Sequence, residues 1–306
     1  MLDYGLPLQF GLSIIPEVAL IDQNQELVAL AEAWGLDLIA IQDHPYLARF
    51  VDTWTLMAFL AAQTSRIRFF PDVVNLALRP PAVLGKAAAT FDRLSGGRLE
   101  LGLGSGGFWD AIASMGGTRR NPAEAVESTE EAMRVIRLVW ENGQSVSFDG
   151  RYYQLHDYPA GPSPAHAVGL WLGVRQPRML RLTGRLSDGW VCPLNVYLPP
   201  ERVPAAQAII DDAARQAGRP LTAVRRIYNV AGAIDAPSAR AGGLSGSAEE
   251  WSQTLSRWAT ELGFDTFIFW PSTTSKEQVE RFATEIVPRT RELVNQARRA
   301  AGTPSP

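Results

Sequence analysis

The stretch FDRLSGGRLELGLGSGGFW, residues 91–109, decides the fold. It predicts a helix that ends at Leu94, a turn at Gly96-Gly97 and a short apolar strand over residues 99–103. The strand leads into Gly104-Ser105-Gly106-Gly107, whose small side chains allow another molecule to approach the backbone closely. The alternative is an ordinary flexible turn. The pattern indicates a strand whose carboxyl end faces a ligand.

Composition narrows the class of protein. The 306 residues are 46% hydrophobic, which supports a substantial core. The formal net charge of -3 shows no basic excess, so we expect neither a nucleic-acid partner nor an anionic membrane surface. Cys192 is the only cysteine, which excludes an intrachain disulfide and fits a reducing compartment.

Targeting signals are not evident in the sequence. The amino terminus MLDYGLPLQFG lacks a basic start followed by an apolar run, and no stretch approaches the ~20 apolar residues of a membrane helix. We therefore expect a cytoplasmic protein. No composition shift divides the chain, so residues 1–306 are predicted to form a single domain, with a frayed tail at 300–306.

Strands and helices alternate along the whole sequence. Eight predicted strands are each followed by a helix, which is the outline of a (β/α)8 TIM barrel, and Asp149-Gly150 predicts a small hairpin inserted after helix four. Asp52, and the pairs Ser247/Glu250 and Ser275/Gln278, predict three helix starts. An open doubly wound sheet is the alternative, and the number of alternations favours closure. The predicted strands cover residues 8–14, 38–41, 67–74, 99–103, 170–174, 190–193, 225–234 and 266–270.

In such a barrel, chemistry lies at the carboxyl ends of the strands. Asp43-His44 is the carboxylate–imidazole pair at such a position, and an imidazole near neutral pH can act as a general acid or base. The alternative is a hydrogen-bonded histidine that merely ends a strand. No histidine spacing resembles a metal site, so we expect no metal.

Other candidates follow further strands. Backbone amides at Gly173-Val174, together with Arg175 or Arg178, are candidates for holding a phosphate, although both arginines are equally consistent with solvated side chains. The apolar run 69–75, which ends in Asp72, Val73 and Asn75, is interrupted where the third strand ends, and a bulge there offers a wall for a flat ring. The aromatic residues at this rim are predicted either to line an apolar substrate pocket or to belong to the core; they are Phe108, Trp109, Trp190 and Trp270.

Three longer stretches, residues 79–106, 132–155 and 170–190, resemble the bacterial luciferase-like superfamily of flavin- and deazaflavin-dependent oxidoreductases, and the resemblance covers nearly the whole chain. Flavin mononucleotide (FMN) members often carry Glu-His-His after the second strand, whereas members that use the deazaflavin coenzyme F-420 tend to carry Ser-Asp-His. Gln42-Asp43-His44 is closer to the deazaflavin pattern. The resemblance therefore implies coenzyme F-420 as the cofactor, with FMN as the alternative.

The resemblance also implies roles for individual residues. Asp43 and His44 would lie beside the reactive ring, with His44 handling the proton. Asp72-Val73 matches a bulge with a non-proline cis peptide that backs the ring. Gly104, Ser105 and Gly106 align with the loop that contacts the cofactor, and Gly173 and Val174 with the amides that bind its phosphate.

Two departures qualify the resemblance. Val174 stands where the family often has a second glycine, which weakens the phosphate site. Gly107 stands where sugar-phosphate dehydrogenases of this branch have a glutamate, which argues against the same general acid and the same substrate.

The predicted function is hydride transfer between coenzyme F-420 and a small organic substrate, by a homodimer. One alternative is an FMN-dependent monooxygenase that needs a separate reductase. Another is a non-catalytic barrel that binds a ligand. The sequence does not identify the substrate.

Overall fold

The computed structural model describes residues 2–273 and 275–302. The parallel strands are β1 Gln9–Ile14, β2 Leu38–Ile41, β3 Arg68–Pro71, β4 Val74–Asn75, β5 Leu101–Gly104, β8 Leu170–Gly173, β9 Gly189–Cys192, β10 Arg225–Ile234, β11 Leu244–Gly246 and β12 Thr266–Pro271. The α-helices are α1 Ile21–Ala33, α2 Thr53–Ala61, α3 Pro81–Ser95, α4 Trp109–Ser114, α5 Pro122–Val139, α6 Pro177–Leu186, α7 Val203–Gln216, α8 Ala248–Leu262, α9 Lys276–Arg281 and α10 Val287–Ala300. Short helical turns cover Val18–Leu20 (η1), Pro200–Arg202 (η2), Leu221–Ala223 (η3) and Phe282–Ile286 (η4, a π turn).

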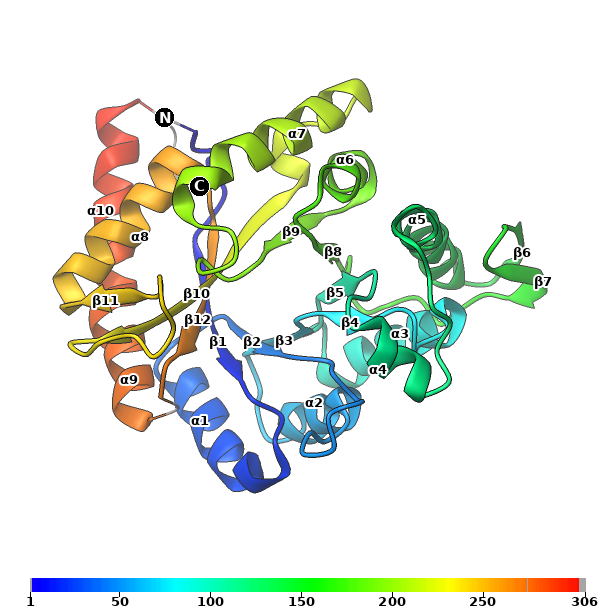
Figure 1. Cartoon of the computed structure of the whole chain (residues 1–306), viewed down its shortest axis with the longest axis horizontal. Helices are drawn as coiled ribbons and strands as arrows, with labels where there is room; N and C mark the ends of the chain where they lie inside the picture. The colour runs from blue at the N-terminus through cyan, green and yellow to red at the C-terminus, as the bar shows by residue number, and fades with distance from the viewer. Residues whose placement is uncertain (1, 274, 303–306) are drawn as a thin grey trace.

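The strands close into a barrel. Their order is β3-β2-β1-β12-β10-β9-β8-β5-β4, with parallel pairing of β1 to β12 at the two ends of the chain. β3 and β4 are two halves of the third barrel strand. A parallel bridge between Phe69 and Leu99 and the pairing of β4 with β5 join this strand to the next, which closes the ring surrounded by helices (Figure 1). The predicted TIM barrel is confirmed.

Side-chain caps account for where several helices begin. Asp52 accepts from Thr55 N and caps α2, and Ser247 with Glu250 forms the predicted capping box of α8. Ser275 caps α9 as predicted, but the side chain of Gln278 does not reach back to it. Instead Gln278 donates to and accepts from the backbone of β10 at Ile234, which fixes the start of α9 against the sheet.

The core has two parts. A larger cluster lies between the barrel and its helices, and a smaller one fills the barrel interior with alternate residues of different strands. Phe70, Trp171, Val191 and Ile268 belong to the inner cluster, against which Val73 packs. The barrel interior is thus a packed core, and in barrels of this kind the active site lies at the end where the strands finish.

Two features lie outside the simple barrel pattern. α4, a short helix directly after the glycine-rich loop, was not predicted. β6 Ser145–Asp149 and β7 Gln154–Pro159 form a separate antiparallel pair between α5 and β8, at the outer side of the molecule (Figure 1). Four residues, 150–153, connect them, rather than the two of a tight Asp-Gly turn.

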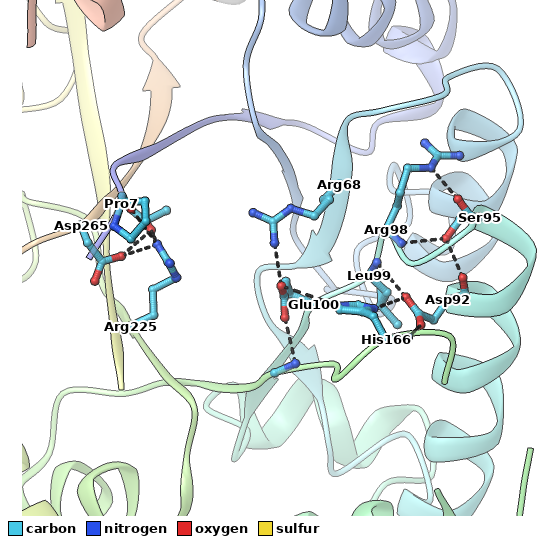
Figure 2. Close-up of polar contacts among 12 residues, drawn as sticks. Pro7, Arg68, Asp92, Ser95, Arg98, Leu99, Glu100, His166, Arg225 and Asp265 are labelled. Carbon is cyan, nitrogen blue, oxygen red and sulfur yellow. Dashed lines mark hydrogen bonds and ion pairs between the residues drawn. The ribbon is translucent and has the colours of Figure 1, made fainter. Parts of the chain in front are cut away.

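Ion pairs close the end of the barrel where the strands begin (Figure 2). Arg68 Nη1 donates to Glu100 Oε1 at 2.7 Å, and His166 Nδ1 lies 2.8 Å from Asp92 Oδ1. Hydrogen bonding to Asp92 raises the pKa of His166 to about 9. Asp92 and Glu100 also accept hydrogen bonds from the backbone amides of His166 and Gly169, so the carboxylates at this end of the barrel are paired within the protein.

Two further points concern the whole chain. The predicted frayed tail falls largely on residues 303–306, which lie outside the described residues. Among the described helices, none is long and apolar enough to cross a membrane.

Candidate active site at the barrel mouth

The break in the third barrel strand shapes the centre of the site. Between β3 and β4 the Asp72–Val73 peptide bond is cis, at the place that the resemblance implies. Val73 turns into the barrel, where its methyl groups occupy the space in which Cβ atoms at Gly104 and Gly173 would lie, at 2.7 Å and 2.8 Å. A Cβ at Gly104 would therefore collide with Val73 of the same chain, which gives this glycine a packing reason in addition to the predicted contact with a ligand.

Asp43 is buried and tightly bound. It accepts two hydrogen bonds of 2.8 Å from Arg79, through Nε and Nη2, and one of 3.1 Å from the Asn75 amide. Arg79 Nη2 also reaches Asp52 at 2.6 Å. A carboxylate held in this way by a guanidinium is a fixed anchor, so Asp43 holds the end of β2 in place and its charge is already neutralised.

His44 follows Asp43, but its side chain contacts aromatic residues and not Arg79. Its Nδ1 lies 2.7 Å from the Tyr46 hydroxyl, and its ring packs edge-on against Phe108 with 5.7 Å between centroids. Burial lowers the pKa of His44, with the charge of Asp43 opposing the shift. The imidazole is therefore neutral near pH 7, with one nitrogen fixed by Tyr46 and the other free to exchange a proton.

Asp72 is the second titratable group at the mouth. Its Oδ2 is enclosed and has no hydrogen-bond partner, and burial raises the pKa of Asp72 to about 7, against the effect of the neighbouring Asn229 amide. Asn229 is itself positioned by Trp270, whose Nε1 donates to Asn229 Oδ1 at 2.8 Å. An acid that is half-protonated near neutral pH thus lies at the base of the site.

Two adjoining compartments open at the mouth, and they share Phe108, Pro193 and Tyr197. The first, of about 450 Å³, is also lined by Ser105, Gly173, Val174, Arg175, Gln176 and Met179. The second, of about 580 Å³, is also lined by Gln42, His44, Tyr46, Leu47, Asp72, Ala111, Leu194, Asn229, Arg240 and Trp270. The first compartment is lined by the backbone of Gly173 and Val174 and by Arg175, and the second contains the titratable His44 and Asp72 together with most of the aromatic residues.

The structure brings most of the predicted site residues to this mouth, with exceptions among the aromatic residues. Trp190 is fully buried, stacks on Phe264 and donates from Nε1 to Val174 O, so of the two alternatives for this residue the structure supports the core. Neighbouring Val191 takes the inward position on β9, and Trp190 accordingly faces the helices. Trp109 packs behind Gly106, where a Cβ would lie 2.8 Å from its ring.

Two polar candidates lie at the margin of the mouth. The backbone N–H of Asn75 donates to Asp43, and the side-chain Oδ1 of Asn75 accepts from Ala77 N. Asn75 is therefore part of the wall behind the compartments. Arg178 is exposed on the first turn of α6, next to the first compartment, whereas Arg175 lines it.

Sequence reasoning missed Arg79, Asn229, Tyr197 and Arg240. Arg79 lies in the stretch that carries the resemblance, but nothing in its spacing shows that it binds Asp43. Asn229 is a polar residue inside the apolar strand β10, which is a usable signal of a function at the barrel interior. Tyr197 and Arg240 come from loops whose course cannot be read from periodicity.

The chemistry of the mouth follows from these groups. It offers a fixed neutral imidazole, a weakly acidic carboxyl, aromatic walls at Phe108 and Trp270, and cationic and amide donors in the adjoining compartment. The half-buried, apolar Val73 lies between Asp72 and Gly173 of these linings. Within the described residues, no group of three His, Cys, Asp or Glu side chains is placed to hold a metal ion. The arrangement suits a planar organic cofactor with an anionic tail, beside a small substrate.

The sequence of this chain matches one protein family. The sequence model of the luciferase-like monooxygenases matches residues 7–253. An F-420-dependent glucose-6-phosphate dehydrogenase of Kineococcus radiotolerans is 32% identical over 197 residues, which cover 62% of this chain and 57% of the relative. A 5,10-methylenetetrahydromethanopterin reductase of Archaeoglobus fulgidus is 30% identical over 184 residues, 60% of this chain and 52% of the relative. The chain spans about half the length of these relatives.

Solved structures agree on the fold. An F-420-dependent secondary alcohol dehydrogenase, in complex with an F-420–acetone adduct, superposes with a TM-score of 0.81 at 18% identity, over 93% of this chain and 99% of that one. The tetrahydromethanopterin reductase of Methanopyrus kandleri gives 0.79 at 16% identity, over 93% and 100%. At these identities the likeness shows the fold.

Proposed function

Because the chain belongs to the luciferase-like monooxygenase family, we propose that it is an oxidoreductase that transfers a hydride between coenzyme F-420 and a small organic substrate. The observation that carries the proposal is the break after β3. It directs Val73 between glycines of β5 and β8 and leaves Asp72 facing the same compartment as His44. Relatives whose names include coenzyme F-420 or a reductase activity support the cofactor.

The residues at the mouth fit this cofactor. The ring would lie on the apolar wall that Val73 makes, where the neighbouring Gly104-Ser105-Gly106 backbone presents little side chain. Asp72 Oδ2, enclosed and without a partner, is a polar atom that such a ring system could satisfy. When bound, coenzyme F-420 would supply or accept a hydride at C5 of its deazaflavin.

The first compartment would hold the anionic part of the cofactor. Gly173 and Val174 end β8 there, and Arg175 extends a guanidinium into it. Phosphates bind well to backbone amides at the start of a helix that carries a nearby arginine. Arg178, one turn into α6, would add charge from the rim.

His44 would handle the substrate proton. The Asp43–Arg79 pair fixes the end of β2, and the Tyr46 hydroxyl orients the ring, so the neutral imidazole can accept or return a proton at the second compartment. His44→Ala should lower turnover by about 100-fold or more with cofactor affinity nearly unchanged. Unaltered turnover in that variant would remove His44 from the mechanism.

The alternative is an FMN-dependent monooxygenase supplied by a separate reductase, which the family description favours. A barrel that binds a ligand without catalysis is the third possibility. Titration of the purified protein with coenzyme F-420 and with FMN, followed by cofactor fluorescence, separates the two cofactor-dependent enzymes, and the turnover of His44→Ala separates an enzyme from the non-catalytic barrel. We expect tight binding of coenzyme F-420 and weak binding of FMN. The reverse order would favour the monooxygenase.

We also propose that the chain acts as one domain and as a cytoplasmic homodimer. The buried, unpaired Cys192 is consistent with a reducing compartment. Analytical ultracentrifugation at micromolar concentration should give twice the mass of the chain. A monomer at that concentration would refute the dimer and leave the cofactor proposal untouched.

A further inference from the structure

A loop between β10 and α8 contributes Arg240 to the lining of the second compartment. Residues 235–247 are fixed by hydrogen bonds to one another and to the end of β12. Ser238 N donates to Ser245 Oγ at 2.9 Å, and Ala239 N donates to Ser272 Oγ at 3.0 Å. β11, at the end of the loop, pairs in parallel with β10. The loop is therefore attached to β10 and to the end of β12.

A second neighbour holds the tip of this loop. Asn195, which follows β9, donates from Nδ2 to Gly242 O at 3.4 Å and accepts from Ala231 N of β10 at 2.8 Å. Arg240 O accepts from Gly243 N at 2.9 Å, which closes the turn on which Arg240 stands. The backbone on both sides of Arg240 is thus hydrogen-bonded to residues at the ends of β9 and β12, and the end of the loop pairs with β10.

The Arg240 side chain has no acidic partner among the described residues, although it lines the second compartment. The acid nearest along the loop, Asp235, is already paired with Arg281 at 2.6 Å. Arg79, which binds the Asp43 carboxylate next to His44 in the sequence, pairs with Asp43 and Asp52. The guanidinium of Arg240 is therefore available to a ligand.

The remaining groups that face this compartment leave it positive or neutral. Burial lowers the pKa of His44 and raises the pKa of Tyr46 to about 12, so both are uncharged near neutral pH. Asp72 is the one acid in the lining, and burial opposes its ionisation. Around these groups the walls are mainly apolar, from Phe108 and Trp270 among others.

We propose that the substrate is a small organic acid with an apolar body, whose carboxylate pairs with Arg240 while the body lies between Phe108 and Trp270, beside His44. The assignment rests on the proposed function, since it names the substrate class of that same site. A guanidinium binds a carboxylate through two parallel hydrogen bonds, which fixes orientation as well as affinity. The body of the acid would then be directed toward the Val73 wall, where the hydride is exchanged.

The test measures binding of benzoate and of its neutral analogue benzamide to the full chain by isothermal titration calorimetry. The wild-type protein should bind benzoate at least about tenfold more tightly than benzamide, in line with a charge-assisted pair. Arg240→Met should abolish this preference and Arg240→Lys should retain part of it. Arg299→Met, which removes an exposed arginine from α10 at a distance from the mouth, should leave it unchanged.

Three outcomes would overturn the proposal. These are equal binding of benzoate and benzamide to the wild type, an undiminished benzoate preference in Arg240→Met, and tighter binding of phenyl phosphate than of benzoate, which would assign the arginine to phosphate esters. Titration of the same samples with coenzyme F-420 keeps the two proposals apart. Normal cofactor affinity without a benzoate preference refutes only the substrate class, and a benzoate preference without cofactor affinity refutes only the cofactor.

Discussion

Gly104→Ala is the substitution that tests most sharply why the strands beside the bulge carry glycine. An added Cβ would lie 2.7 Å from Val73 Cγ2, well inside the 3.4–4 Å of ordinary contact, and the next neighbours are Val74 O at 3.3 Å and Val73 Cβ at 3.8 Å. Overpacking of this kind costs about 1–3 kcal/mol. Removal of the two Val73 methyl groups leaves only the longer contacts, so Val73→Ala should relieve most of that cost.

The assay is a double-mutant cycle by urea denaturation of wild type, Gly104→Ala, Val73→Ala and the double variant. Val73→Ala alone should lose about 1–2 kcal/mol of unfolding free energy. The double variant should lose less than the sum of the two single losses, by at least about 1 kcal/mol. Gly107→Ala is the matched control, because a Cβ there meets nothing within 4 Å, and it should change stability by less than about 0.5 kcal/mol. Strict additivity in the cycle would refute the argument that Val73 requires glycine at position 104.

Three further predictions concern charged groups. Arg79→Met leaves the buried Asp43 carboxylate without its partner and should cost about 3 kcal/mol of unfolding free energy, measured by urea denaturation; a loss below about 1 kcal/mol would contradict the anchoring role. The raised pKa of His166, about 9, means that its protonated form stabilises the fold fully below about pH 6.5 and that this contribution is lost as the pH rises through 9. In His166→Gln the urea midpoint should therefore depend less on pH between pH 6.5 and 9 than in the wild type. An unchanged pH dependence would show that Asp92 does not stabilise the fold through the imidazolium of His166. The pKa of Asp72 in the folded protein is raised to about 7, so ionisation of Asp72 destabilises the fold as the pH rises from about 4 to 7. The urea midpoint of Asp72→Asn should therefore increase relative to that of the wild type over this interval. A difference between the two midpoints that does not change with pH would show that another group titrates there.

Much of the fold could be predicted because local signals and tertiary packing agree. Asp52, Ser247 and Ser275 cap the helices that they were expected to cap, since a side-chain oxygen before an amphipathic segment satisfies amides that no other group reaches. β10 has the predicted bounds, residues 225–234, because the segment 227–234 is apolar except for Asn229, and a mainly apolar run is typical of a strand buried on both faces.

The same property of parallel strands hides which way each side chain points. Trp190 and Val191 are both apolar and adjacent, so nothing in the sequence shows that Val191 faces the barrel interior and Trp190 the helices. The short helix α4 was missed because six residues are too few to show a period.

Long-range polar contacts were the largest omission at the site. Arg79 lies 36 residues from Asp43, and the parallel pairing of β2 with β3 brings the end of β2 next to the segment before α3. The role of Gln278 was misassigned for a similar reason, since its partner, Ile234, is 44 residues away. Spacing rules describe contacts within one helix turn and cannot report such pairs.

The proposed function requires a planar redox cofactor that rests on Val73 within reach of His44. A crystal structure of the protein grown with coenzyme F-420 tests this most directly. We predict that the deazaflavin contacts Val73, with its phosphate beside Arg175 and the second compartment open in front of His44. A deazaflavin bound away from Val73, or a mouth that remains without the cofactor at saturating concentration, would contradict it.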